Sequence, residues 1–113
     1  MKEIKAIIQP FMLERVCAVL REIEGLPGIT VSQVMGWGKS RAADARDPVQ
    51  EAGIAFARKT KMEIVVSASL APRVVAAIES AARTGNVGDG KIFVYDVEEV
   101  VKIRTGERGE EAI

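Results

Sequence analysis

Residues 84–91 read Thr-Gly-Asn-Val-Gly-Asp-Gly-Lys and connect a helical sequence pattern to a strand pattern. The glycines allow a backbone turn that presents several N–H groups to an anion, and Lys91 adds a positive charge. The same glycines are also typical of a helix C-cap followed by a tight turn. The spacing from Gly85 to Lys91 imitates a P-loop, but Ile92 stands where Mg²⁺ binding needs Ser or Thr, and a P-loop leads from strand to helix. We therefore exclude a P-loop and keep the other two interpretations.

Outside this turn the sequence alternates between strand and helix patterns. Alternating or β-branched apolar residues predict strands over residues 2–9, 29–37, 61–66 and 92–97, with a short fifth strand over residues 100–105. Apolar residues at three- and four-residue steps predict helices over residues 13–23 and 70–83. The order βαββαβ predicts an α+β fold of the ferredoxin-like kind, built on one antiparallel sheet in a single domain over residues 1–113.

Residues 39–59 lie between two strand patterns but show no sustained apolar period of their own. The stretch is polar and alanine-rich, carries charges of both signs and includes Pro48 and Gly53. About 20 residues without regular structure usually form a functional loop in a compact domain, so we expect a flexible effector loop here. The alternatives are a disordered insertion or a short surface helix over residues 49–57. The charged tail, residues 106–113, is expected to be mobile.

One face of the predicted sheet has no helix to cover it, because two helices suffice for the other face only. The uncovered face carries the apolar side chains of Ile7, Val65, Phe93 and Tyr95. So apolar a sheet face is not expected to be exposed to water, and we predict that self-association covers it.

Composition excludes several classes of function. The chain has 113 residues with 16 basic and 16 acidic side chains, no histidine and one cysteine. A neutral balance argues against a nucleic-acid binder that works by general attraction to phosphates. The residue counts also exclude a disulfide framework, a His-based metal site and a Ser/His/Asp triad, so no metal site is expected. No stretch approaches the roughly 20 apolar residues of a membrane helix, and we expect a cytoplasmic protein with Cys17 as a buried thiol.

Two further stretches are candidates for ligand binding. Lys102 and Arg104 are two residues apart on the predicted fifth strand, which places both cations on one face, with Val101 and Ile103 directed inward. Such a cation pair suits a polyphosphate, or it forms surface ion pairs with Glu98 or Glu99. Residues 36–39, Gly-Trp-Gly-Lys, either permit close backbone approach to a ligand at a strand end or simply open a loop.

Taken together, these stretches resemble the PII signal-transduction family, the nitrogen regulatory proteins PII, over nearly the whole chain. The matching segments are residues 5–11 (KAIIQPF), 30–31 (TV), 36–38 (GWG), 59–66 (KTKMEIVV), 84–94 (TGNVGDGKIFV) and 102–107 (KIRTGE). The segment over residues 84–94 is the most specific, because it closely resembles the C-terminal signature of the family.

The resemblance implies a homotrimer that binds ATP or ADP in three clefts between subunits and controls a partner protein through its flexible loop. In that picture Gly88, Asp89, Gly90 and Lys91 line the phosphates, and Lys102 and Arg104 reach them from the neighbouring subunit. The residues expected around the base, the ribose and the loop root are Thr30, Gly36, Trp37, Gly38, Lys39, Glu63 and Val65. No enzymatic activity is implied.

The sequence departs from the family pattern in the loop. Ser40 stands where the family usually has a Gln that helps to hold Mg²⁺ and 2-oxoglutarate, so the resemblance does not carry these ligands over, although Lys59 matches a lysine expected at the 2-oxoglutarate site. Ala52 stands where many members have a tyrosine that receives a nucleotidyl group, which excludes that modification there. Residues 41–55 differ throughout, so the ammonium channel of the family is not carried over as the partner. The expected partner is a membrane transporter, either an ammonium channel or a metal-efflux pump, or another target in nitrogen or metal metabolism.

Two other functions compete with the nucleotide sensor. The first is a trimeric module of the divalent-cation-tolerance type that binds metal or serves assembly, against which the absence of histidine weighs. The second is a small phosphate-handling enzyme, which would need a histidine base or a nucleophile that the sequence does not supply.

Overall fold

A computed structural model describes residues 1–37, 48–51 and 54–113. Its five-stranded antiparallel sheet has the order β2-β4-β1-β5, with β3 paired to β4 at the outer end. The strands are β1 (Lys2–Ile8), β2 (Thr30–Gly36), β3 (Pro48–Glu51), β4 (Ile54–Val66) and β5 (Gly90–Asp96), and the helices are α1 (Leu13–Leu20) and α2 (Ala71–Ala82). The predicted ferredoxin-like α+β fold is confirmed.

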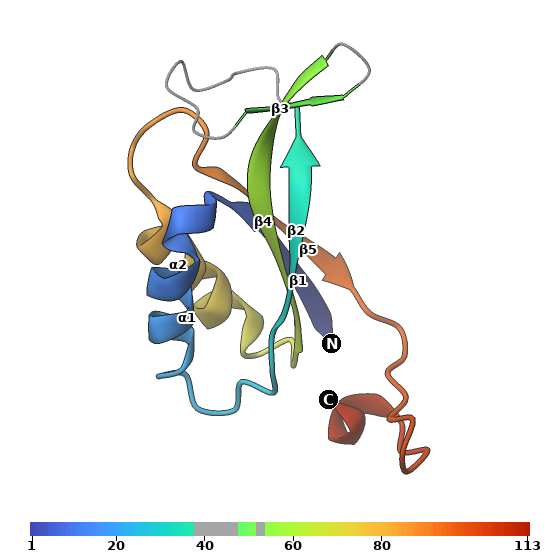
Figure 1. Cartoon of the computed structure of the whole chain (residues 1–113). Helices are drawn as coiled ribbons and strands as arrows, with labels where there is room; N and C mark the ends of the chain where they lie inside the picture. Colours follow the sequence, from blue (N-terminus) through green and yellow to red (C-terminus); the bar gives the residue numbers. More distant parts are fainter. Residues whose placement is uncertain (38–47, 52–53) are drawn as a thin grey trace.

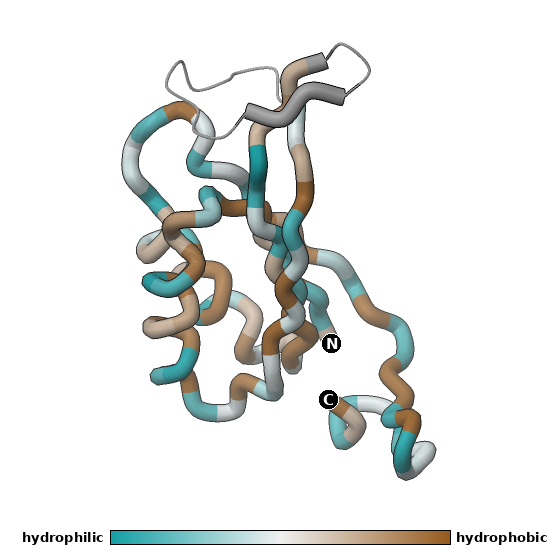
Figure 2. Tube along the Cα trace, viewed as in Figure 1, coloured by the Kyte–Doolittle hydropathy of each residue, from teal (hydrophilic) through white to brown (hydrophobic). Residues whose placement is uncertain are grey.

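Both helices cover the same face of the sheet and pack against each other (Figure 1). Alternation along the strands supplies the other half of this core, since Ile4 of β1 is paired with Ile64 of β4 and both are buried. The fully buried side chains come from β1, β4 and the inner stripes of the helices, including Ile4, Ile8, Val16, Leu20, Met62, Ile64, Val74 and Ile78. Hydrophobic and hydrophilic positions are correspondingly interleaved along the trace (Figure 2).

The first helix begins at Leu13 as predicted but differs from the prediction at its C-terminal end, and a short helical turn precedes it. Pro10–Met12 form a 3₁₀ helix, and the α-helix then ends at Leu20 rather than continuing to Ile23. Ile23 is nevertheless buried, because a turn in which its N–H donates to the Leu20 carbonyl folds it onto the core. Cys17 is half-buried and packs against the core rather than being fully enclosed.

The segment between β2 and the predicted third strand contains more regular structure than the sequence pattern indicated. Strand β4 begins at Ile54 instead of residue 61, and β3 pairs with it from Pro48↔Ala57 to Glu51↔Ile54. Residues 54–59 are therefore strand, which corrects the expectation of a loop over residues 39–59 and the alternative of a helix over residues 49–57. The expected flexibility of residues 38–47 and 52–53 lies outside the described residues.

The predicted fifth strand over residues 100–105 is wrong. Val101 forms an isolated bridge with Arg108, and residues 103–105 make the turn of a small hairpin between them. Ile103 is 98% exposed at this turn and does not point inward. In the tail, Gly109–Ala112 form a 3₁₀ helix, Ala112 is buried, and the Gly109 N–H donates to the Val100 carbonyl. We call residues 97–113 the C-terminal arm. The mobility of its last residues stays a prediction.

Among the described residues no helix combines the length and the hydropathy needed to cross a bilayer.

Thr60 of β4 is fully buried, and its hydroxyl finds no hydrogen-bond partner among the described residues. It lies opposite Ile8 of β1 and Gln33 of β2, on the face that the helices cover. Burying a hydroxyl without a partner costs about 1–3 kcal/mol.

Because valine has the same shape and no hydroxyl, we expect Thr60→Val to raise the free energy of unfolding by about 1 kcal/mol. Urea unfolding at one fixed protein concentration measures this change. Thr84→Val is the control, since the Thr84 hydroxyl is hydrogen-bonded to Asp89, and its loss is expected to lower stability. A destabilised Thr60→Val variant would contradict the assignment.

Candidate functional site

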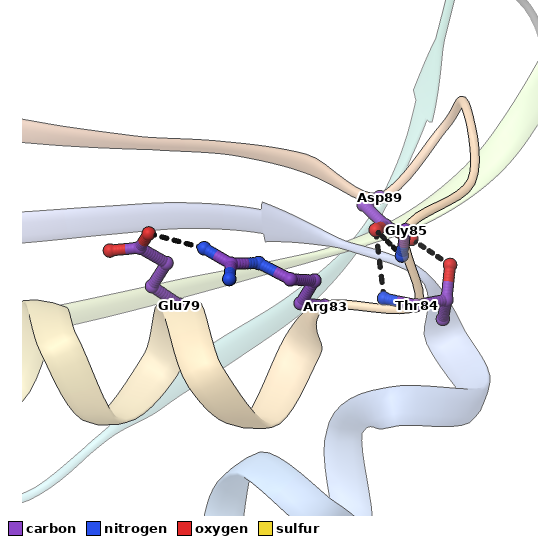
Figure 3. A network of polar contacts seen from close by, with 5 residues as sticks. All are labelled: Glu79, Arg83, Thr84, Gly85 and Asp89. Atoms are coloured by element: carbon purple, nitrogen blue, oxygen red, sulfur yellow. Dashed lines mark hydrogen bonds and ion pairs between the residues drawn. The ribbon is translucent and has the colours of Figure 1, made fainter.

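The turn over residues 84–90 is built around the carboxylate of Asp89 (Figure 3). One carboxylate oxygen accepts hydrogen bonds from the backbone N–H groups of Thr84, at 2.8 Å, and Gly85, at 2.9 Å. The Thr84 hydroxyl donates to the other oxygen and in turn accepts the N–H of Asn86 at 3.1 Å. Asp89 therefore joins the end of α2 to the start of β5 and closes the turn into a ring of polar contacts.

The electrostatics of Asp89 follow from this geometry. Partial burial by itself would raise the pKa of its carboxyl group, but the hydrogen bonds from Thr84 and Gly85 and the charge of Lys59 together outweigh burial and lower the pKa. The carboxylate consequently stays charged, and its oxygens are engaged in hydrogen bonds within the turn. Of the predicted phosphate residues, Asp89 is the one whose side chain acts on the turn itself.

Three successive backbone amides of the turn remain available. Within the described residues, the N–H groups of Val87, Gly88 and Asp89 donate no hydrogen bond. Gly88 has a φ of +98° and Gly90 a φ of +103°, a backbone region that residues with a side chain rarely adopt. Successive unpaired N–H groups of this kind form a concave binding surface for an anion.

Gly90 also fixes how the turn enters the sheet. It is paired with Ile8 of β1, and a Cβ atom added to it would lie 1.7 Å from the Ile7 carbonyl oxygen. No side chain fits between these two backbones. A glycine is thus required at position 90 both because a side chain would collide with Ile7 and because φ is positive. The residue after it, Lys91, lies directly opposite Ile7.

Strand β4 reaches the turn through one side chain. The Lys59 ammonium donates to the Gly88 carbonyl oxygen at 2.6 Å. Burial lowers the pKa of Lys59, and the nearby Asp89 carboxylate opposes this shift in part. In this structure the Lys59 ammonium is therefore bound to the backbone of the turn. Its expected role at a 2-oxoglutarate site stays a prediction.

An open groove of about 380 Å³ lies between α2 and the start of β5. Its charged lining consists of Asp89 and Lys91 from the turn side and Glu79 and Arg83 from α2 and its C-cap. Arg83 and Glu79 form an exposed ion pair at 2.5 Å (Figure 3). The remaining lining residues are Ile7, Ile8, Val75, Ile78, Ala82, Gly90 and Ile92.

A second group of predicted residues gathers on the open face of the sheet. Thr30 at the start of β2 is paired with Glu63 of β4, and Val65 lies two residues further along β4 on the same side. The Glu63 carboxylate lies 3.5 Å from the Lys61 ammonium. These side chains occupy the inner part of the sheet, away from the hairpin formed by β3 and β4.

The predicted loop-root residues lie at the other end of β2. Gly36 is its last residue and is opposite Ala57 of β4, and Trp37 follows with 63% of its surface exposed. Gly38 and Lys39 are outside the described residues, as are Ser40 and Ala52.

Lys102 and Arg104 lie on the C-terminal arm, at the opposite end of β5 from the glycine turn (Figure 1). The Lys102 ammonium lies 3.8 Å from a Glu107 carboxylate oxygen, and Arg104 lies in the exposed hairpin turn. Within one chain the structure therefore does not bring these cations to Lys91.

The face opposite the helices carries the expected apolar groups. Phe93 and Tyr95 are 40% and 41% exposed, while Ile7 and Val65 are half-buried. The Lys5 ammonium lies over both aromatic rings, 5.3 Å from the centre of Phe93 and 5.0 Å from that of Tyr95. The open face thus exposes two aromatic rings, and the Lys5 ammonium makes cation–π contacts with both of them.

Sequence reasoning missed Thr84, Glu79 and Arg83 as parts of this region. Thr84 could have been found from its place before Gly85 and five residues ahead of an acidic residue, since hydroxyl and carboxylate side chains commonly close turns of this length. Glu79 and Arg83 have only the four-residue spacing of a helical ion pair as a signal, and that spacing says nothing about a groove.

Fold and turn together define a ferredoxin-like protein with a glycine turn of unpaired backbone amides at one end of β5 and the C-terminal arm at the other. The family model described as "Nitrogen regulatory protein P-II" matches residues 1–107, and the chain belongs to this family. It is 48% identical over 113 residues to the nitrogen regulatory protein P-II of Rhodospirillum rubrum, and equally to that of Azospirillum brasilense, with both chains covered completely. The corresponding protein of Nostoc punctiforme is 45% identical over the same length.

Membership of the family decides between the functions that the sequence left open. P-II proteins are non-enzymatic signal transducers in nitrogen regulation, and the family typically binds adenine nucleotides. The phosphate-handling enzyme is thereby set aside, and the divalent-cation-tolerance module is not the family that matches. Across residues 1–37, 48–51 and 54–113, no three Cys, Asp or Glu side chains lie together as a metal cluster.

Replacing Gly90 by alanine is expected to lower the free energy of unfolding by at least about 3 kcal/mol, because the new methyl group collides with the Ile7 backbone. Gly85→Ala is the matched control. It has a similarly positive φ of +89° but open space around it, so only about 1 kcal/mol is expected. Equal losses in urea unfolding would show that the close contact with Ile7 does not matter.

Asp89 makes stability depend on pH in a defined direction. Its folded-state pKa lies below the ordinary value of 3.8, so the charged carboxylate stabilises the fold above about pH 4, and this contribution is lost as the pH falls through the folded-state pKa. We expect wild type to exceed Asp89→Asn in stability from pH 5 to 7, and the difference to shrink toward about pH 3. Urea midpoints measured across this range test it, and a difference that is independent of pH would contradict it.

Proposed function

We propose that this protein is a trimeric adenine-nucleotide sensor that binds ATP or ADP in clefts between subunits and controls a partner protein through the segment between β2 and β4. The observation that carries the proposal is the turn over residues 84–90. Its three unpaired amides, held by Asp89 and adjoined by Lys91, form a surface suited to the phosphates of a nucleotide.

Two features of the single chain support a trimer: a sheet face that it leaves exposed, and cations that lie far from the turn of the same chain. The open sheet face exposes Phe93 and Tyr95, which a partner subunit would bury. The arm carries Lys102 and Arg104 away from the turn of its own chain, so that they would contribute to the cleft of a neighbour. In that cleft the two cations would add to Lys91 in neutralising a polyphosphate.

The remaining predicted residues would complete this cleft. Thr30, Glu63 and Val65 would contact the base and ribose, and Gly36, Trp37, Gly38 and Lys39 would form the root of the effector segment. A nucleotide shifts this segment only by its different affinity for the segment's alternative states. The regulated partner would be a membrane transporter, either an ammonium channel or a metal-efflux pump, with the sensor itself in the cytoplasm.

Calorimetric titration of the wild type with ATP, ADP and AMP tests the ligand. We expect ATP and ADP to bind more tightly than AMP, because AMP has the fewest phosphate charges for the turn and Lys91 to meet. Lys91→Ala is expected to weaken ATP binding at least about tenfold, whereas Lys2→Ala, a lysine that is ion-paired with Asp96 outside the site, leaves it unchanged. The single Trp37 provides an independent fluorescence signal at the segment root. An absence of heat from ATP and ADP at millimolar concentration would refute the proposal.

Mixing two defective variants tests whether the clefts are shared. Lys91→Ala removes the turn cation and Arg104→Ala the arm cation, so neither variant alone has an intact cleft. When the two are unfolded, mixed in equal amounts and refolded, about one quarter of the clefts should combine an intact turn with an intact neighbouring arm. Recovery of that fraction of ATP sites at wild-type affinity is the expected result. No recovery in a confirmed mixed trimer would place both cations in one subunit's site or in none.

A further inference from the structure

The contact between Lys59 and Gly88 joins two segments that are distant in the sequence. Its donor and acceptor are 2.6 Å apart and belong to residues separated by 29 positions. The Lys59 side chain is half-buried, so water competes poorly for this charged hydrogen bond. The contact is therefore strong enough to restrain the backbone that it touches.

The restrained atom belongs to a peptide group with a second function. The Gly88 carbonyl and the Asp89 N–H are parts of one planar trans peptide, and none of the described residues has a cis bond. In such a group the carbonyl and the N–H point in opposite directions. Holding the carbonyl toward Lys59 thus directs the Asp89 N–H away from it, as one of the three unpaired amides of the turn.

This peptide needs an external restraint because its flanking residue is a glycine. Gly88 changes its backbone angles at little cost, and rotation of the peptide plane is the ordinary way in which such turns interconvert. The ring of contacts around Asp89 fixes its side chain, Thr84 and Gly85, but it leaves this plane free. A rotated plane would present a carbonyl oxygen, which repels an anion, instead of an N–H.

Strand pairing in the sheet positions Lys59 to reach the Gly88 carbonyl. Lys59 is opposite Val34 of β2, and its Cγ would lie 3.7 Å from a Cβ atom added to Gly36. This distance is an ordinary van der Waals contact, so the lysine chain runs directly beside Gly36 on its way to the turn.

We propose that Lys59 is a positioning residue for the glycine turn: by holding the Gly88 carbonyl it orients the Asp89 N–H for the phosphate of the ligand. The inference rests on the proposed nucleotide site and adds a requirement to it. Lys59 acts here through the backbone, and its role differs from that of Lys91, whose charge would meet the ligand itself.

The test compares Lys59→Met with Arg58→Met in the full-length protein. Both variants remove one positive charge from neighbouring positions of β4, but the Arg58 side chain is exposed and lies on the other side of the strand. Inorganic tripolyphosphate is the calorimetric probe, since it tests the turn without the base. The amide ¹⁵N–¹H signal of Asp89 in the ligand-free protein is the second readout, because it reports on the peptide plane directly.

We expect Lys59→Met to weaken tripolyphosphate binding at least about tenfold and to shift or broaden the Asp89 amide signal, while Arg58→Met changes affinity by less than about twofold and leaves the signal in place. A weakened affinity with an unchanged Asp89 signal would show that Lys59 acts as a simple charge and would overturn the inference. Unchanged affinity and signal would overturn it as well.

Failure of the proposed function remains distinguishable from failure of this inference. A wild type that binds neither tripolyphosphate nor ATP refutes the nucleotide site. The Asp89 signal of the ligand-free variants still decides whether Lys59 holds the peptide plane.

Discussion

The close approach of two backbones at Gly90 is the constraint on which the rest of the structure depends. Because no side chain fits between Gly90 and the Ile7 carbonyl, the observed register of β5 against β1 requires a glycine where β5 begins. That register places Lys91 opposite Ile7 and sets the ends between which the turn must close. The Asp89 carboxylate then closes it, so an anion-binding geometry results from the way in which a helix is returned to a sheet.

A single chain forms the hydrophobic core, but it does not bring together all the residues of the proposed cleft. The helices bury the β1 and β4 side chains of one sheet face, including Ile4 and Ile64, whereas the opposite face keeps aromatic side chains in contact with solvent and holds the Lys5 ammonium above them. The glycine turn and the arm cations lie at opposite ends of β5. Folding and the proposed nucleotide binding therefore place different demands on the sequence: the core forms within one chain, whereas the proposed cleft would need an assembly.

The sequence predicted those parts of the structure that local patterns control. Alternation over residues 2–9 and 92–97 gave β1 and β5, and the glycines of residues 84–91 indicated the turn. The outer half of β4 was missed because residues 54–59 are stabilised by pairing with β2 and β3 rather than by helices, so they show no polar–apolar alternation. Ile103 was misplaced because alternation shows which side chains share a face but not whether anything covers it. The contact of Lys59 with Gly88 joins residues 29 positions apart, and no spacing in the sequence encodes it, whereas the contact of Thr84 with Asp89 is local.

The uninterrupted course of β4 has a mechanical consequence. The strand runs for 13 residues from the central sheet into the hairpin with β3, and its outer six residues extend about 20 Å at the usual rise of a strand. A tilt of about 10° at the inner end would displace the outer end by roughly 3 Å, and such a strand transmits the tilt without a hinge. A small tilt of β4 near Lys59 would thus become a larger displacement at the outer end of the strand, because the displacement grows with distance from the core.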